Sequence, residues 1–211
     1  MNQKVVVVTG CTEGGIGYHL AKEFAQNNCR VFATARRVEA IGDVEALGME
    51  KVHLDVANKE SIQTAIEQIV EKAGRIDILV NNAAIHSVGA IADVDLGQVR
   101  RAIETNVIGV LAMSQAVIPL MAAQGGGKIV NIGSIVGYLP LPWAGIYSMT
   151  KAALSSFSDT MRIEVKPFNI DVIVVTPDVI PSHPRPLLSS ISQEQSNPTS
   201  TSPARRRRPS H

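Results

Sequence analysis

Ser134, Tyr147 and Lys151 have the side-chain types needed to move a proton onto or off a carbonyl oxygen. Tyr147 and Lys151 lie four residues apart in a segment whose pattern predicts a helix, so they share one helix face. Tyrosine exchanges protons poorly at neutral pH because its ordinary pKa is about 10, and a nearby cation favours the phenolate. The phenol could then act as general acid to a carbonyl being reduced, or its phenolate as base to an alcohol being oxidised, while Ser134 hydrogen-bonds the reacting oxygen. The pair alone also fits an ordinary solvated helix face.

The amino-terminal segment has the pattern of a phosphate-binding strand, loop and helix. The β-branched run 4–8 predicts a buried parallel strand, and residues 18–27 predict an amphipathic helix. The loop between them reads Thr9-Gly10-Cys11-Thr12-Glu13-Gly14-Gly15-Ile16-Gly17. Glycines there permit a tight turn and close approach of a pyrophosphate, which the amides of the helix N-terminus then bind.

Two arginines stand where a dinucleotide-binding fold selects its cofactor. NAD enzymes usually carry an acidic residue about 20 positions after the glycines, to bind the ribose hydroxyls. This chain has Arg36 and Arg37 at the end of the next expected strand. Guanidinium groups suit a 2′-phosphate, although such a pair can also be merely solvated. The sequence therefore favours NADP(H) over NAD(H).

The periodicity along the chain predicts alternating strands and helices. Expected strands cover residues 4–8, 30–35, 52–54, 76–80, 128–132 and 170–175, and expected helices cover 18–27, 59–73, 97–124 and 145–166. This alternation predicts an α/β fold of the Rossmann type, a doubly wound parallel sheet in three layers. Ligands of such sheets bind at the carboxyl ends of the strands. Thr9, Asn81, Ser134 and Pro177 all fall at or just after such ends.

Taken together, these motifs resemble the short-chain dehydrogenase/reductase family over residues 4–177. The resemblance implies a catalytic set of Asn106, Ser134, Tyr147 and Lys151, in which Tyr147 exchanges the proton and Lys151 binds the nicotinamide ribose and lowers the tyrosine pKa. Asn106 would hold a water chain to the lysine. The implied cofactor residues are Thr9, Gly10, Gly14, Gly15, Ile16, Gly17, Arg36, Arg37, Asp55, Val56, Asn82, Ala83, Tyr147, Lys151 and Pro177. No metal site is predicted.

Two positions depart from the family pattern. Ala84 replaces the usual glycine of the Asn-Asn-Ala-Gly segment, and four residues instead of three separate Gly10 from Gly15. Gly14 and Gly15 therefore remain alternative phosphate-facing residues. A narrower likeness, carried by residues 9–17, 33–37 and 165–169, is to NADPH-dependent 1-acyldihydroxyacetone-phosphate reductases. It implies a keto-lipid substrate and a location at the endoplasmic reticulum or lipid droplets.

Composition agrees with a single catalytic domain. The 211 residues carry a net charge of +1, which gives no sign of a nucleic-acid partner. The sequence lacks both an uninterrupted apolar run of roughly 18 residues and a signal-peptide pattern, so we expect a cytoplasmic chain without a transmembrane segment. Cys11 and Cys29 are expected to be free thiols. The resemblance also implies a homo-oligomer formed through the 97–124 and 145–166 helices.

The pattern changes after Pro177. We expect residues 1–180 to form the NADP(H)-binding catalytic domain, without the family's last strand and helix, and residues 181–211 to form a disordered Pro/Ser/Arg-rich tail. His86, Leu139, Leu141 and Trp143 are expected in loops beside the site, as an apolar substrate lining or as plain surface residues. The leading hypothesis is an NADPH-dependent carbonyl reductase acting on a small molecule. The alternatives are a splice-type variant that only binds nucleotide or pairs with a full-length reductase, and a sugar-nucleotide epimerase.

Overall fold

Six parallel strands form one sheet in the order β3-β2-β1-β4-β5-β6. The computed structural model describes residues 3–139 and 141–177, and the predicted tail, 181–211, lies outside them. The strands are β1 (Val5–Thr9), β2 (Arg30–Ala35), β3 (Met49–His53), β4 (Ile78–Asn81), β5 (Gly127–Ile132) and β6 (Ile170–Val175). The helices are α1 (Ile16–Gln26), α2 (Lys59–Ala73), α3 (Leu96–Ile103), α4 (Gly109–Ala123) and α5 (Gly145–Val165).

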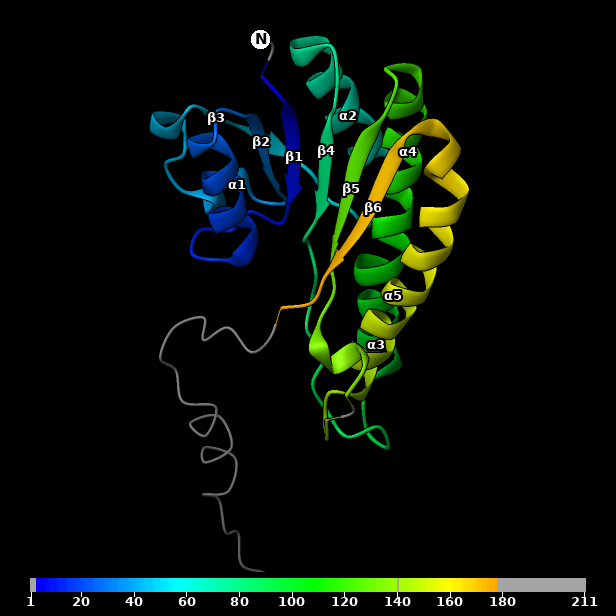
Figure 1. Ribbon diagram of the computed structural model, residues 1–211. Helices are drawn as coiled ribbons and strands as arrows, with labels where there is room; N and C mark the ends of the chain where they lie inside the picture. Colours follow the sequence, from blue (N-terminus) through cyan, green and yellow to red (C-terminus); the bar gives the residue numbers. More distant parts are fainter. Residues whose placement is uncertain (1–2, 140, 178–211) are drawn as a thin grey trace, which may run out of the picture. The chain divides into compact units, whose positions relative to one another are not determined.

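The sheet is doubly wound, as the alternating pattern predicts. β1 pairs with β2 on one side and with β4 on the other, so the strand order reverses between β1 and β4. A crevice at such a reversal is where doubly wound sheets bind ligands. Figure 1 shows α1 on one side of the sheet and α2, α4 and α5 on the other.

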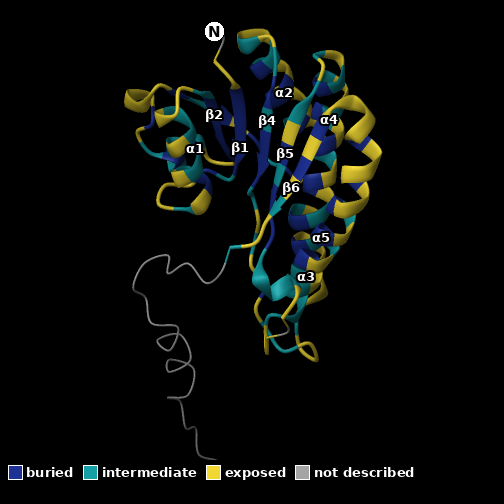
Figure 2. Ribbon diagram, viewed as in Figure 1, coloured by how far each residue is buried: buried dark blue, intermediate teal, exposed yellow. Residues whose placement is uncertain are grey.

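Two apolar cores lie on the two faces of the sheet (Figure 2). The larger core joins β1, β2, β5 and β6 to α2, α4 and α5, and includes Phe32, Ile69 and Met113. The smaller core packs α1 against β1 and β2 through side chains such as Val8 and Ala21. All five residues of β1 are buried because both of its faces are covered.

The expected helix over 97–124 is interrupted. A π-helical turn, Glu104–Ile108, separates α3 from α4. The whole helical stretch Leu96–Ala123 has a mean hydropathy of 1.7 in its most apolar window, so by length and composition it is apolar enough to cross a membrane. In this fold it covers the sheet, and Met113, Val117 and Met121 lie in the larger core.

Strand and helix boundaries differ most at the third expected strand. The sequence predicted 52–54, whereas β3 is Met49–His53. β3 is the edge strand, and its polar residue Glu50 forms ion pairs with Arg30 and Lys72 instead of entering the core. An edge strand needs fewer apolar residues, which hides its start in a hydropathy pattern. β4 begins two residues later than expected and α1 two residues earlier.

Candidate active site

Hydrogen bonds between the ends of β1 and β4 fix the floor of the site. The hydroxyl of Thr9 accepts from the backbone N–H groups of Asn82 and Ala83, each at 3.0 Å. The Asn82 amide donates to the carbonyl oxygens of Thr9 and Gly10, at 2.8 and 3.0 Å. Thr9 and Asn82 therefore hold the glycine loop against the end of β4, where the strand order reverses.

The glycine loop is shaped by positions that exclude larger residues. Gly10 has a φ of +73°, and a Cβ there would lie 2.8 Å from the Cα of Ala83. A Cβ at Gly17 would lie 2.7 Å from the carbonyl oxygen of Gly10 and would also meet the Asn82 amide. Because neither position has a Cβ, α1 lies close to the ends of the strands, and the free amides of its first turn face that end of the sheet.

Gly14 and Gly15, the two alternative phosphate-facing glycines, have different structural roles. Gly14 adopts a φ of +76°, and a Cβ there would meet nothing within 4 Å. Gly15 is the N-cap of α1 in extended conformation, and its N–H donates to the carbonyl of Thr12 at 2.9 Å. The N–H of Gly15 is thus used within the loop, whereas Gly14 lies on the open side.

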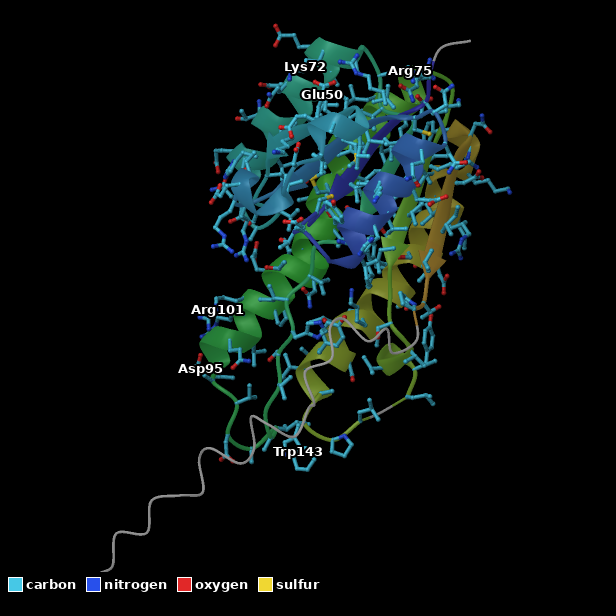
Figure 3. All side chains as sticks on the ribbon, turned by 90° about the vertical axis from the view of Figure 1, so that its left-hand side faces the viewer. Glu50, Lys72, Arg75, Asp95, Arg101 and Trp143 are labelled. Carbon is cyan, nitrogen blue, oxygen red and sulfur yellow. The ribbon has the colours of Figure 1, made fainter. Side chains whose placement is uncertain are left out.

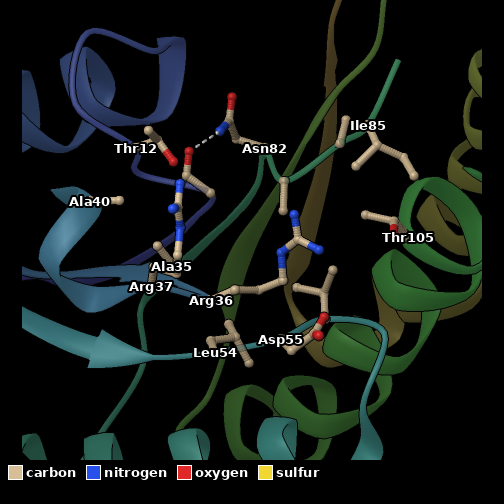
Figure 4. A pocket seen from close by; sticks show the side chains of 14 residues that line it. Thr12, Ala35, Arg36, Arg37, Ala40, Leu54, Asp55, Asn82, Ile85 and Thr105 are labelled. Carbon is tan, nitrogen blue, oxygen red and sulfur yellow. Dashed lines mark hydrogen bonds between the residues drawn. The ribbon is translucent and has the colours of Figure 1, made fainter. Parts of the chain in front are cut away.

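A polar pocket of about 200 Å³ lies beside this loop, at the ends of β1, β2 and β4. Arg36 and Arg37 follow β2 directly. Figure 4 shows the Arg37 side chain pointing toward Thr12 and the Arg36 side chain pointing toward the part of the pocket bordered by Ile85 and Thr105. Asp55 and Val56 line the pocket from the segment after β3. The two guanidinium groups give this pocket side chains that suit an anion, alongside the carboxylate of Asp55.

The pocket brings together part of the cofactor set expected from the sequence. It contains Gly10, Arg36, Arg37, Asp55, Val56, Asn82 and Ala83. The other members of the set are outside its lining: Thr9, Gly14, Gly15, Ile16, Gly17, Tyr147, Lys151 and Pro177. Sequence reasoning missed Thr12, Ala35, Ala40, Leu54, Ala84, Ile85 and Thr105. Thr12 and Ala84 lie within recognised motifs, and Ile85 and Thr105 adjoin recognised residues, so these four could have been inferred from position, whereas Ala40 carries no local signal.

Tyr147 and Lys151 share a face of α5, as their spacing predicts. The Lys151 ammonium nitrogen lies 5.6 Å from the centroid of the Tyr147 ring and donates to the carbonyl of Ile132 at 2.7 Å. Lys151 is buried, and the hydroxyl of Ser134, which follows β5, lies near enough to the tyrosine side chain to favour its ionised form. A phenol, a hydroxyl and an ammonium group from two elements therefore converge near the carboxyl end of β5.

The electrostatics of this cluster correct one expectation. Burial raises the pKa of Tyr147, and the nearby Ser134 hydroxyl offsets this only in part, whereas the sequence predicted a pKa lowered by Lys151. Burial also lowers the pKa of Lys151 to about 8. Burial therefore disfavours the charged form of both side chains.

Asn106 lies in the π-helical turn and is buried. Its side-chain oxygen accepts from the N–H of Ile85 at 2.8 Å, and its nitrogen donates to the carbonyl of Ile85 at 2.9 Å. The same nitrogen donates to the hydroxyl of Thr150 at 3.1 Å, and that hydroxyl donates to the carbonyl of Tyr147. Asn106 therefore connects the loop after β4 to the turn of α5 that carries Tyr147. The water chain to Lys151 stays a prediction.

Two loops, one after β4 and one between β5 and α5, extend beyond this cluster. They are joined where the N–H of Gly89 donates to the carbonyl of Trp143 at 2.9 Å. Leu139, Leu141 and Trp143 expose more than half of their surface, and His86, also exposed, packs its ring against Tyr147. In Figure 3, Trp143 lies at the opposite end of the domain from Glu50, Lys72 and Arg75. Apolar side chains thus gather at the end of the sheet that carries the site.

The described residues fit a dinucleotide. The Gly10 and Gly17 positions form a cradle that a Cβ would fill, the N-terminus of α1 supplies amides, and Arg36 and Arg37 supply positive charge for an additional phosphate. Tyr147 and Lys151 lie near the end of β5, apart from the arginine pocket. A dinucleotide would extend from one to the other across the point where the strand order reverses.

Comparisons with curated proteins identify relatives along most of the chain. It is 42% identical over 178 residues to the short-chain dehydrogenase ptmH of Penicillium ochrochloron, covering 83% of this chain and 65% of the relative. It is 37% identical to the NADPH-dependent 1-acyldihydroxyacetone phosphate reductase of Schizosaccharomyces pombe, covering 81% and 57%. It is 36% identical to the 3-ketodihydrosphingosine reductase of Bacteroides thetaiotaomicron, covering 84% and 64%. The chain thus spans 57 to 65% of the length of these relatives.

Solved structures agree. A short-chain dehydrogenase from Streptomyces avermitilis superposes with a TM-score of 0.82 at 35% identity, covering 86% of this chain and 68% of that one. The sequence profile described as short chain dehydrogenase matches residues 4–187. The chain therefore belongs to the short-chain dehydrogenase family of oxidoreductases.

Proposed function

We propose that this protein is an NADPH-dependent carbonyl reductase in which Tyr147 is the general acid. The observation that carries the proposal is the placement of the Tyr147 phenol beside both the Ser134 hydroxyl and the Lys151 ammonium group. These groups lie on the same doubly wound sheet as the arginine-lined pocket, near the ends of its strands. Relatives with this fold include proteins named as reductases.

Arg36 and Arg37 support the choice of NADPH. In the pocket they stand where an NAD site uses an acidic residue, and neither forms an ion pair with another described residue, so a 2′-phosphate would suit them as a counter-charge. Tyr147 and Lys151 would hold the nicotinamide ribose. When bound, the cofactor supplies a hydride.

The protonation state of Tyr147 supports the reductive direction. Because burial raises the pKa of Tyr147, the phenol keeps its proton at neutral pH and has it available for the oxygen of a carbonyl undergoing reduction. Ser134 donates a hydrogen bond to the same oxygen and fixes its position. Lys151 is near its own pKa of about 8, so it can replace the proton that the phenol gives up.

A keto-lipid is the proposed substrate class. The loops beyond Tyr147 carry exposed apolar side chains, among them Ile91, Leu139 and Trp143, which suit an acyl chain better than a polar metabolite. Two relatives are named for reducing 1-acyldihydroxyacetone phosphate and 3-ketodihydrosphingosine. An acyldihydroxyacetone phosphate or a related lipid ketone is therefore the first substrate to test.

We also propose that the chain pairs with itself through α4 and α5. A groove between these helices is lined by apolar side chains that include Leu111, Ile118 and Phe157. Leu111 is partly exposed on the outer surface of α4. Leu111→Glu should therefore convert a dimer measured by light scattering into a monomer, and an unchanged mass would count against this interface.

The deciding experiment separates cofactor binding from turnover. NADPH and NADH are titrated against the wild-type chain and against Arg36→Ser/Arg37→Ser, and the binding-competent proteins are then assayed with acyldihydroxyacetone phosphate. We expect the wild type to prefer NADPH, and the double variant to lose about ten- to a hundredfold in NADPH affinity with little change for NADH. Tyr147→Phe should still bind NADPH, with an affinity reduced by no more than the loss of one hydrogen bond to the ribose, and should turn over no substrate. Equal affinities for both cofactors would contradict the NADPH assignment.

The same data test the hypothesis of a non-catalytic partner. NADPH binding without turnover of any carbonyl substrate, in wild type and Tyr147→Phe alike, would favour a nucleotide-binding or dimerising role. Turnover that depends on Tyr147 would exclude it.

A further inference from the structure

His86 packs directly against the Tyr147 side chain. The two ring centroids are 4.5 Å apart, and the ring planes are tilted by 32°. His86 comes from the loop after β4, whereas Tyr147 comes from the first turns of α5, so the contact joins two elements far apart in the sequence. Such an arrangement is favourable for two aromatic rings and restricts the movement of both.

The backbone beside His86 is fixed from both directions. Asn106 pairs with the N–H and the carbonyl of the preceding residue, Ile85, and also donates to Thr150 on α5. On the other side, Ser87 is buried. His86 therefore lies in a short loop that Asn106 links to the first turns of α5, the part of the helix that carries the Tyr147 phenol. This link keeps the two rings next to each other.

The imidazole is neutral where the phenol titrates. Burial, together with the positive charge of Lys151, lowers the pKa of His86. Tyr147 and Lys151, both on α5, are the titratable groups that the structure places against this ring. Although His86 is itself exposed, its neutral ring lies against one face of the Tyr147 ring without adding a charge, so its effect on Tyr147 is to keep water from that face.

We propose that His86 is a positioning residue for Tyr147: its stacked imidazole covers one face of the phenol, excludes water from it, and holds it toward Ser134. The catalytic consequence rests on the function proposed above, whereas the stack itself does not.

Removing the ring should change the ionisation of the phenol. Tyrosinate absorbance is followed during an alkaline titration, and the Tyr147 signal is isolated as the difference between each protein and its Tyr147→Phe counterpart. His86→Ala admits water, so the Tyr147 pKa should fall toward its ordinary value by about half a unit or more. His86→Phe keeps a stacked ring and should leave the Tyr147 pKa within about 0.2 unit of the wild type. If His86→Ala does not fold, His86→Gln removes the ring while keeping the bulk of the side chain.

Kinetics supply the second readout. We expect His86→Ala to lower kcat for the ketone about tenfold, with NADPH affinity unchanged, and His86→Phe to restore most of kcat. Equal Tyr147 pKa values in all three proteins would overturn the proposal, as would a His86→Phe variant that behaves like His86→Ala. A wild-type chain that turns over no ketone counts against the proposed function alone, because the titration needs neither cofactor nor substrate.

Discussion

The side-chain amide of Asn106 completes both main-chain hydrogen bonds of Ile85, accepting from its N–H at 2.8 Å and donating to its carbonyl at 2.9 Å. Ile85 lies beyond the end of β4, where no strand in the described part of the chain pairs with its backbone. Asn106 thus supplies from a helix the hydrogen bonds that a sheet would otherwise provide. The π-helical turn at Glu104–Ile108 is where this side chain leaves the helix.

Asn106→Leu should destabilise the domain. It leaves two polar groups of Ile85 without their partners, each at a cost of about 1–3 kcal/mol of unfolding free energy. A chain of this size should then melt roughly 2–4 °C lower for each kcal/mol. Thermal unfolding checks this, with Asn106→Asp as the matched control, because the aspartate keeps an acceptor for the Ile85 N–H and should be intermediate. A leucine variant as stable as the wild type would show that the pair is dispensable.

Gly17→Ala should weaken both packing and NADPH binding. The added methyl group would lie 2.7 Å from the Gly10 carbonyl oxygen, so the loop or α1 must shift. Gly48→Ala is the matched control, because Gly48 has a φ of +73° but nothing within 4 Å of a Cβ. We expect the control to lose about 1 kcal/mol in a urea melt with unchanged NADPH affinity, and Gly17→Ala to lose more stability together with affinity. Similar losses in the two variants would mean that the close approach is unimportant.

The stability of the wild type should carry a contribution from Lys151 that rises with pH. Burial lowers the pKa of this lysine from 10.5 to about 8, so the unfolded chain binds the proton more tightly. The cost of the buried ammonium group, on the order of 3 kcal/mol, is fully present below pH 8 and disappears as the pH rises toward 10.5.

Lys151→Met isolates this effect. Both proteins are unfolded with urea between pH 7 and pH 9.5. The unfolding free energy of the wild type, relative to that of Lys151→Met, should increase as the pH increases. The comparison uses differences because the raised pKa of Cys11, about 12, lowers the stability of both proteins in alkali. Two parallel curves would show that Lys151 is not titrating with a depressed pKa.

The two cysteines should react very differently with a thiol reagent. Cys11 is fully buried, its thiol lies 3.2 Å from the carbonyl oxygen of Val8, and burial raises its pKa to about 12. Cys29 is only partly buried. The native protein should therefore release one equivalent of thionitrobenzoate from Ellman's reagent, and a second only in denaturant. Cys29→Ser should release none before unfolding; rapid labelling of Cys11 in that variant would contradict its burial.

Local patterns predicted the elements whose boundaries depend on local signals. The helix over 59–73 begins after Asn58, whose side chain accepts from the N–H of Ser61, and ends at Gly74 in the left-handed conformation. The shared face of Tyr147 and Lys151 follows from helical periodicity alone. The start of β3 escaped detection because its polar side chains belong to a sheet edge, a property of the assembled sheet.

The parts of the site that depend on distant packing were not predictable in this way. The π-helical turn accompanies the pairing of Asn106 with Ile85, a contact across 21 residues. The direction of the Tyr147 pKa depends on how deeply the folded chain buries the phenol, so the helical spacing that located Lys151 gave the wrong sign. Ala40 reaches the pocket because its segment meets the ends of the strands there in space.

The position of β1 in the sheet sets the order in which the nascent chain can complete its binding loop. β1 precedes the other described strands in the sequence, but it lies between β2 and β4. Its pairing with β2 is available once residue 35 has emerged, whereas its pairing with β4 and the Asn82 hydrogen bonds to Thr9 and Gly10 must wait for residues 78–82. Contacts so distant in sequence form slowly. The glycine loop therefore acquires its final shape only after nearly half of the described chain has left the ribosome.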